Sequence, residues 1–178
     1  YAGRESKIII ESARKSISEM LNTSPSSIFF TSGGTEANNM AIRGAINSYK
    51  IQHAITSPIS HHAVLYPLED LEKEGKIKLS YVDIDNNGLV SLSHLKKLLE
   101  NNPKTLVSIM HANNEIGIIQ DIKEIGRICK LHDAIFHSDT VQTIGHFPFD
   151  LRDIEVDFIT ASAHKFHGPK GVGFIYIS

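Results

Sequence analysis

The sequence predicts an α/β protein of three layers, with a mostly parallel sheet between helices. Two observations lead to this prediction. Short apolar runs of strand length alternate with longer segments whose apolar residues recur at helical spacing. Turn-forming residues separate these segments, as in Asp-Asn-Asn-Gly at 85–88. We find no repeats and no internal linker, and 178 residues suit a single domain, so one domain over 1–178 is expected.

Five segments have the periodicity of helices. In the first, Ile8, Ala13 and Ile17 recur at near-helical spacing, and Asn22 and Pro25 mark its end. Serine and aspartate are good N-caps and stand where the fourth and fifth helices begin. The expected helices cover residues 4–22, 35–48, 63–74, 91–100 and 121–132.

Seven short apolar runs lie before or after these helices and are typical of buried strands. The expected strands cover residues 28–31, 53–57, 78–83, 105–111, 134–139, 157–162 and 171–177. In an open parallel sheet, ligands bind beyond the carboxyl ends of the strands. The residues that follow each strand are therefore the candidates for a functional site.

Two glycines and a threonine follow the first strand and open directly into a helix. Glycine lets the backbone approach a ligand closely, and a helix N-terminus presents free N–H groups and the positive end of its dipole. Gly34 and Thr35 could therefore hold a phosphate. Taken alone, such residues more often form an ordinary strand-to-helix turn with Thr35 as the cap.

Two further strand ends carry polar side chains. Asn113 and Asn114 follow the strand 105–111, where an amide could bind a ligand oxygen or simply shape the loop. Asp139 ends an apolar strand, where a carboxylate without a partner is costly. A cationic ring nitrogen or a nearby helix N-terminus would be a suitable partner, and a helix cap is the simpler interpretation.

Lys165 lies just beyond the strand 157–162, close to Ser162 and His164. A desolvated lysine could form a Schiff base there, and its two neighbours could reach a phosphate. A surface lysine in a Gly/Pro turn is the alternative. Taken together, a phosphate cradle, a carboxylate for a ring nitrogen, amide donors and this lysine are the groups that pyridoxal 5'-phosphate (PLP) requires.

Five stretches resemble cysteine desulfurases (NifS/IscS-like), which belong to the class-V aminotransferase group of fold-type I PLP enzymes. These stretches are TSGGTEANNMAI, SHHAVL, HANNEIGIIQDI, FHSDTVQTIGHFPFDL and SAHKFHGPKGVGFIY. They occur in family order and cover almost the whole chain. The resemblance implies that residues 1–178 are the PLP-binding large domain, without the family's N-terminal segment and C-terminal small domain.

The resemblance assigns a phosphate-binding role to residues at two strand ends. The backbone of Gly34 and the hydroxyl of Thr35 would hold the phosphate from one side. Ser162 and His164 would hold it from the other side.

It also assigns roles around the cofactor ring. His61 would stack on the ring and take part in proton transfer, and Asn114 and Gln142 would contact the phenolic oxygen. Asp139 would pair with the pyridinium nitrogen. Lys165 would bond the cofactor and then move protons at the substrate α-carbon.

The chain departs from the family pattern in three places, one of which is Ser60, before His61, where relatives often have an acidic residue. The small residue that usually follows the pyridine-binding aspartate is here Thr140, which could crowd the ring. The family's sulfur-accepting cysteine lies on a loop well beyond the lysine, whereas the single cysteine here is Cys129. Cys129 shares a helix face with Ile122 and Ile125, so we expect a small buried hydrophobe rather than a nucleophile.

The resemblance implies a PLP-dependent cysteine desulfurase, which converts L-cysteine to L-alanine and passes a persulfide sulfur to an acceptor protein for iron–sulfur cluster or thiocofactor assembly. Without the nucleophilic cysteine, we expect a cofactor-domain fragment with little or no turnover of its own. The full-length enzyme would be a homodimer. A selenocysteine lyase, a kynureninase-like hydrolase, an aminotransferase or a non-catalytic remnant are the alternatives.

Composition argues against several other classes. The chain is 41% hydrophobic and 21% charged, and a net charge of −2 gives no electrostatic case for nucleic acid or membrane. No apolar run approaches the roughly 20 residues of a membrane span, and residues 1–7 do not resemble a signal peptide. One cysteine fits a reducing compartment, so a cytoplasmic location is expected. The ten histidines show no metal-binding spacing, and no metal site is expected.

Overall fold

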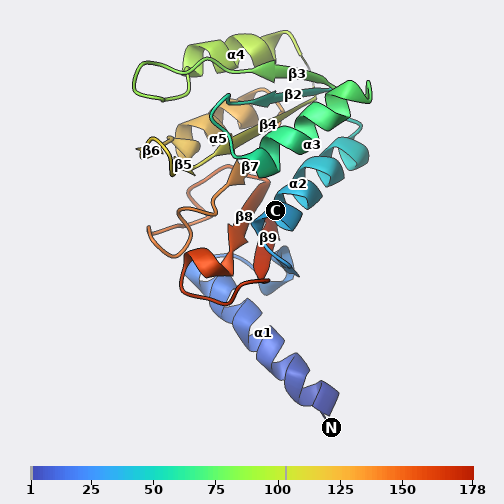
Figure 1. The fold of residues 1–178 in the computed structure, drawn as a ribbon, viewed down its shortest axis with the longest axis vertical. Coiled ribbons are helices and arrows are strands. Elements are labelled where there is room, and N and C mark those ends of the chain that lie inside the picture. The colour runs from blue at the N-terminus through green and yellow to red at the C-terminus, as the bar shows by residue number, and fades with distance from the viewer. Residues whose placement is uncertain (1, 103) are drawn as a thin grey trace.

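The computed structural model describes residues 2–102 and 104–178 and contains a seven-stranded sheet between two layers of helices (Figure 1). The strands of this sheet are β1 (Ile28–Thr31), β2 (His53–Thr56), β3 (Lys78–Tyr81), β4 (Thr105–Met110), β7 (Ile135–Asp139), β8 (Phe158–Ser162) and β9 (Gly173–Ile177). Their order is β1-β9-β8-β7-β4-β2-β3. β9 runs antiparallel to β8 and β1, and the other pairs are parallel. The predicted fold class is confirmed.

The helices are α1 (Ala2–Met20), α2 (Gly34–Tyr49), α3 (His62–Lys73), α4 (Leu92–Glu100) and α5 (Ile122–Leu131). α2 and α3 cover one face of the sheet, and α4 and α5 cover the other (Figure 1). The predicted caps of the last two helices are confirmed, since Ser91 accepts from the His94 amide and Asp121 from the Glu124 amide. Every predicted helix and strand is present within a few residues of its expected ends.

Four short elements were not predicted. β5 (Ala112–Asn113) and β6 (Ile118–Ile119) form a short antiparallel hairpin. Two 3₁₀ turns are also present: η1 (Pro25–Ser27) follows α1, and η2 (Ala163–Lys165) follows β8. Segments of two or three residues are too short to show any periodicity in the sequence.

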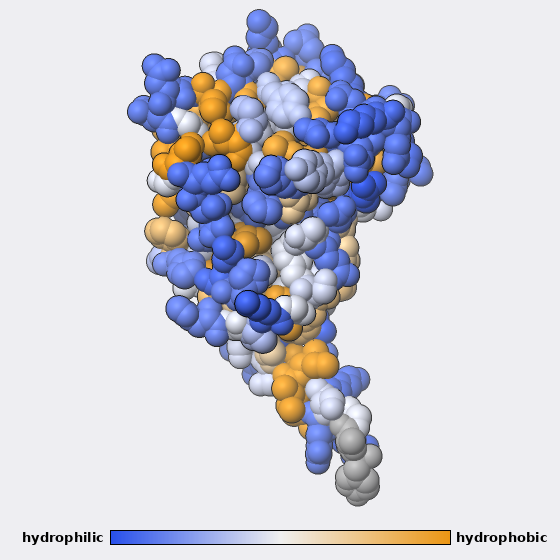
Figure 2. Space-filling view, in the orientation of Figure 1, coloured by the Kyte–Doolittle hydropathy of each residue, from blue (hydrophilic) through white to orange (hydrophobic). Residues whose placement is uncertain are grey.

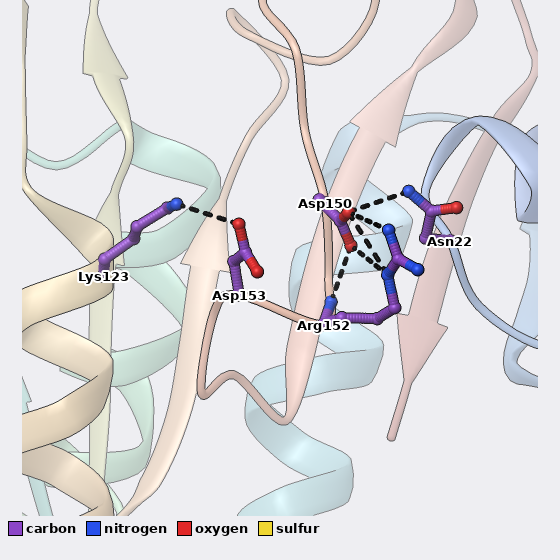
Figure 3. A network of polar contacts seen from close by, with 5 residues as sticks. All are labelled: Asn22, Lys123, Asp150, Arg152 and Asp153. Carbon is purple, nitrogen blue, oxygen red and sulfur yellow. Dashed lines mark hydrogen bonds and ion pairs between the residues drawn. The ribbon is translucent and has the colours of Figure 1, made fainter.

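The long connection between β7 and β8 is held to the body by polar contacts from two other parts of the chain (Figure 3). Asp150 accepts a hydrogen bond from Asn22 Nδ2 at 2.9 Å and pairs with Arg152 at 2.6 Å. The pKa of the Asp150 carboxyl is lowered by the hydrogen bonds from Arg152. Lys123 Nζ of α5 lies 3.3 Å from Asp153. These exposed contacts connect residues 150–153, in the second half of the connection, to α5 and to the turn after α1.

The N-terminal part of α1 projects from the body (Figure 1) and exposes three consecutive isoleucines. Ile8, Ile9 and Ile10 are 62%, 70% and 47% exposed, and apolar colour marks this region in Figure 2. Contacts with the body begin further along, where the Arg14 guanidinium lies 5.0 Å from the centre of the Phe30 ring. Within the described residues, no helix combines the length and the apolar character needed to cross a membrane.

His137 is a fully buried polar residue in the middle of β7. Its Nδ1 shares a 2.8 Å hydrogen bond with Ser108 Oγ, and its Nε2 has no partner among the described residues. Burial lowers the pKa of the His137 imidazole to about 3. The folded protein therefore keeps this ring neutral at pH values where the unfolded chain binds a proton.

The substitution His137→Gln tests this effect, because glutamine can still bond Ser108 but does not titrate. Because the pKa is depressed in the folded state, the free energy of unfolding has its full value above pH 6.5. It declines as the pH falls towards 3, since the unfolded chain then binds a proton that the folded chain does not. Between pH 7 and pH 4 we expect the free energy of unfolding to fall by about 3 kcal/mol more in the wild type than in the variant. Urea unfolding at several pH values measures this difference, and equal pH dependence in both proteins would contradict it.

Candidate active site

A cavity of about 190 Å³ opens beyond the carboxyl ends of the parallel strands. The structure brings together at this cavity all nine residues that the sequence singled out for a cofactor site. They are Gly34, Thr35, His61, Asn114, Asp139, Gln142, Ser162, His164 and Lys165. Four further residues line it that the sequence did not indicate, namely Asn38, Ala63, Met110 and Val141.

The topology explains why residues so far apart in sequence meet. β1, β2, β4, β7 and β8 run in the same direction, so their carboxyl ends lie at one edge of the sheet. Each strand leads into a segment that contributes to the cavity. Gly34, His61 and Asn114 follow β1, β2 and β4, while Asp139 and Ser162 are the last residues of β7 and β8.

The N-terminus of α2 faces this edge, and its cap differs from the prediction. Gly33 is the N-cap and no side chain caps the helix, so the interpretation of Thr35 as the cap is wrong. Thr35 lies one residue inside the helix, and its hydroxyl is not used for capping. A Cβ atom at Gly34 would lie 2.7 Å from Val141 Cγ2 and 3.6 Å from Ser162 Cβ. The backbone of α2 therefore packs against the turn after β7 as closely as a glycine allows.

The segment after β8 brings a lysine and two polar side chains to the cavity. Ser162 Oγ and His164 Nδ1 lie 2.9 Å apart and share a hydrogen bond. Lys165 ends η2, and its carbonyl oxygen accepts a hydrogen bond from His146 Nε2 at 2.6 Å. Within residues 2–102 and 104–178, Lys165 Nζ makes no hydrogen bond or ion pair, and it lines the cavity. Its amine is therefore available to a ligand.

Asp139 is a buried carboxylate, 4% exposed, at the end of β7. Its Oδ1 accepts from the Val141 amide at 3.1 Å and its Oδ2 from Asn38 Nδ2 at 2.8 Å. The first contact closes a local turn and does not cap a helix, so the helix-cap interpretation is wrong. Burial raises the pKa of the Asp139 carboxyl, although both hydrogen bonds lower it. No ion pair to this carboxylate occurs in the part of the chain that the structure describes.

His61 is exposed at the mouth of the cavity and caps α3. Its Nδ1 accepts a hydrogen bond from the Ala63 amide at 3.0 Å. Because Nδ1 acts as an acceptor, the proton of the neutral ring lies on Nε2. Nε2 is therefore the atom of this ring that can exchange a proton with a ligand.

The two adjacent asparagines after β4 have different surroundings. The sequence left open whether an amide here binds a ligand oxygen or shapes the loop. Asn113 is buried and shapes the loop, with Nδ2 donating to the Ile59 carbonyl at 2.7 Å and Oδ1 accepting from the Glu115 amide at 2.8 Å. Asn114 is exposed and lines the cavity. One amide thus holds the loop and the next faces the site.

Thr140 does not crowd the cavity as the sequence suggested. Its side chain is fully buried, its hydroxyl donates to the Thr160 carbonyl at 2.8 Å, and it is not among the described residues that line the cavity. Val141 lies there instead. Val141, and not Thr140, therefore limits the space in the cavity beside Asp139.

Asn38 is the polar residue that sequence reasoning missed. It is 1% exposed and stands among Ala37, Ala41 and Ile42 on the buried face of α2. An amide within an apolar helix stripe is costly unless it is hydrogen-bonded, and this was the signal available in the sequence.

Cys129 lies away from the cavity, in α5. It is 1% exposed, and burial raises the pKa of its thiol. The expectation of a small buried hydrophobe is confirmed. Among the described residues there is no group of three or more His, Cys, Asp or Glu side chains that could hold a metal ion.

Comparison with known proteins gives consistent results. The family model described as aminotransferase class-V matches residues 2–178. The cysteine desulfurase IscS of Dictyoglomus turgidum is 49% identical over an alignment of 179 positions, which covers 99% of this chain and 45% of that relative. The solved structure of a NifS-like protein has a TM-score of 0.94 at 44% identity, covering 99% of this chain and 49% of the other.

A second solved structure, described as SspA in complex with cysteine, has a TM-score of 0.92 at 36% identity and covers 98% of this chain and 50% of the other. The chain thus spans about half the length of the relatives that it matches. Because the family model matches almost every residue, the chain belongs to the class-V aminotransferase family, and within it is similar to the cysteine desulfurases.

Proposed function

We propose that the cavity binds PLP and that Lys165 bonds it covalently. The observation that carries this proposal is that one cavity of about 190 Å³ is lined by every residue type the cofactor needs. Cysteine desulfurases and class-V aminotransferases are PLP-dependent families, which agrees with the proposal. When bound, PLP withdraws electrons from the α-carbon of an amino acid and so weakens the bonds to it.

The phosphate would lie at the N-terminus of α2. The free N–H groups and the helix dipole there favour an anion, and α2 is long enough to carry a full dipole. The Thr35 hydroxyl would donate from the helix side. Ser162, at the end of β8, and His164, in η2, would bind it from the other side; because they share a 2.9 Å hydrogen bond, both donate to the anion only when the His164 ring carries two protons.

The ring nitrogen would lie against Asp139. This carboxylate is buried, and both of its hydrogen-bond donors are neutral amides, Val141 N and Asn38 Nδ2. A protonated ring nitrogen would supply the positive charge that a buried carboxylate needs. Asn114 and Gln142, which line the same cavity, would donate to the phenolic oxygen.

Two residues would move protons in the reaction. Lys165 would exchange a proton with the substrate α-carbon once its amine is released, because no described residue holds that amine elsewhere. His61 would exchange a proton through Nε2, because its Nδ1 is occupied by the Ala63 amide.

We further propose that the substrate is L-cysteine and that the complete protein is a cysteine desulfurase. The similarity to IscS and to a solved structure in complex with cysteine supports this choice. The reaction would yield L-alanine and transfer sulfur to an acceptor protein, in a homodimer located in the cytoplasm. The burial of Cys129 argues that this thiol is not the one that receives the sulfur.

Lys165→Ala tests the covalent site, with Lys97→Ala as the control, an exposed lysine of α4 that does not line the cavity. We expect the wild type and the control to retain a visible absorption band after excess PLP is removed, and Lys165→Ala to lose it. Reduction with borohydride should fix the cofactor to the peptide that contains Lys165. Retention of the band by a folded Lys165→Ala protein would refute the proposal.

Gly34→Ala tests the close contact beneath the phosphate. The new Cβ would lie 2.7 Å from Val141 Cγ2, so either Val141 or the first turn of α2 must shift. Because Gly34 and Val141 both line the cavity, their displacement disturbs the binding site, and we expect the dissociation constant for PLP to rise by about tenfold. The double variant Gly34→Ala/Val141→Ala should recover most of the affinity. Thermal melts of each variant separate this effect from loss of folding, and unchanged affinity in Gly34→Ala would contradict the contact.

Cys129 should react with a thiol reagent only when the protein opens. We expect labelling in native buffer to be slower than in denaturant by about two orders of magnitude, because the thiol is buried and its pKa is raised. Stopped-flow absorption at both conditions measures the two rates. Rapid labelling of the native protein would show that the Cys129 thiol is reactive, and would contradict the conclusion that it does not receive the sulfur.

A further inference from the structure

Asn38 joins the proposed ring-nitrogen partner to a second strand of the sheet. It is 1% exposed, comes from α2, and lines the cavity beside Asp139. A buried amide is tolerated when its oxygen and its nitrogen both have partners. Both partners of Asn38 are themselves buried residues of neighbouring strands, Asp139 at the end of β7 and Thr160 in β8.

The hydrogen bonds of Asn38 run in one direction. Thr160 Oγ1 donates to Asn38 Oδ1 at 2.6 Å, and Asn38 Nδ2 donates to Asp139 Oδ2 at 2.8 Å. A carboxylate accepts only, so the amide must turn its NH₂ towards Asp139 and its oxygen towards Thr160. Turning the amide over would set its oxygen against an ionised carboxylate. The observed order therefore suits the charged form of Asp139.

The sheet register holds this chain of three residues in place. Asp139 and Thr160 are directly paired across β7 and β8. The Thr160 carbonyl in turn accepts from the hydroxyl and the amide of Thr140, at 2.8 Å and 3.2 Å. The Val141 amide fixes the other carboxylate oxygen at 3.1 Å. Each carboxylate oxygen thus has one protein donor and remains able to accept another bond from the cavity.

We propose that Asn38, oriented by the Thr160 hydroxyl, is a positioning residue that keeps the Asp139 carboxylate ionised and aimed at the cavity. This inference rests on the proposed function, because the ring nitrogen of PLP is the cation that Asp139 would receive there. Asn38 acts through Asp139, while Thr160 acts through Asn38. The titratable groups that share the cavity with Asp139 are His61, His164 and Lys165, and every variant below retains them.

The first test needs no cofactor. The Asp139 carboxyl carbon is followed by NMR against pH in the protein without PLP, in the wild type, in Asn38→Leu and in Asn39→Leu. Leucine has nearly the shape of asparagine but donates no hydrogen bond. We expect the Asp139 titration to move to higher pH in Asn38→Leu. Asn39→Leu is the matched control, since Asn39 is one residue further along α2 and donates to the Thr35 carbonyl at 3.0 Å. It should titrate as the wild type does.

Two variants of Thr160 distinguish the effect of its hydroxyl group from the effect of its side-chain shape. Thr160→Ser keeps the donor, whereas Thr160→Val keeps the volume and leaves Asn38 Oδ1 buried without a donor. We expect Thr160→Ser to keep the wild-type titration of Asp139 and Thr160→Val to shift it to higher pH. Equal titrations in Thr160→Val and the wild type, or equal shifts in both Thr160 variants, would overturn the orienting role of the hydroxyl.

The second test uses PLP. We expect the dissociation constant to rise by about tenfold in Asn38→Leu, and the pH dependence of the bound-cofactor absorption to shift with it. If the wild type retains no PLP, the proposed function fails, and the NMR titration still decides whether Asn38 positions Asp139. If the wild type binds PLP and Asn38→Leu matches it in Asp139 titration and in affinity, the inference fails while the proposed function stands.

Discussion

The parallel pairing of strands is the constraint on which the rest of the molecule depends. Once β2, β4, β7 and β8 pair in parallel, their carboxyl ends must lie at one edge, and each connection must return over a face of the sheet. The helices that make these returns bury both faces. The same pairing therefore builds the core and delivers side chains from separate loops to one cavity.

Burial on both faces makes a polar group in the sheet costly unless it has a partner inside the protein, and His137 Nε2 and Ser138 Oγ are the exceptions among the described residues of the sheet. His53 lies between Thr105 and Ser80, at 3.0 Å and 2.8 Å, and Thr56 donates to the Ser108 carbonyl at 2.9 Å. Asp139 meets the same requirement with neutral donors alone. Among the described residues that line the cavity, Asp139 is the one carboxylate, and a cationic ligand would supply the opposite charge that this buried group lacks.

Agreement between sequence and structure was good wherever the signal was local. Periodicity located the helices and strands, and Ser91 and Asp121 were recognised as caps because a cap acts within its own turn. The sequence was a poor guide to side chains whose partners lie far away in the sequence. The sequence suggested that Thr140 could crowd the ring, yet its hydroxyl donates to the Thr160 carbonyl on the next strand. The alternative interpretation of Thr35 as the cap of α2 was wrong, because the helix begins one residue earlier with Gly33 as its N-cap.

The sequence by itself determined the order of elements, the family, and which residue types stand at the strand ends, because these depend on short-range patterns and on motifs. Only the tertiary structure decided which nitrogen of His61 is free and showed that Asn113 holds the loop through the Ile59 carbonyl. It also revealed the link from Asn38 to Asp139 and Thr160, residues separated by 101 and 122 positions. Such a link is set by the pairing of β7 with β8 and the packing of α2, which no local pattern records.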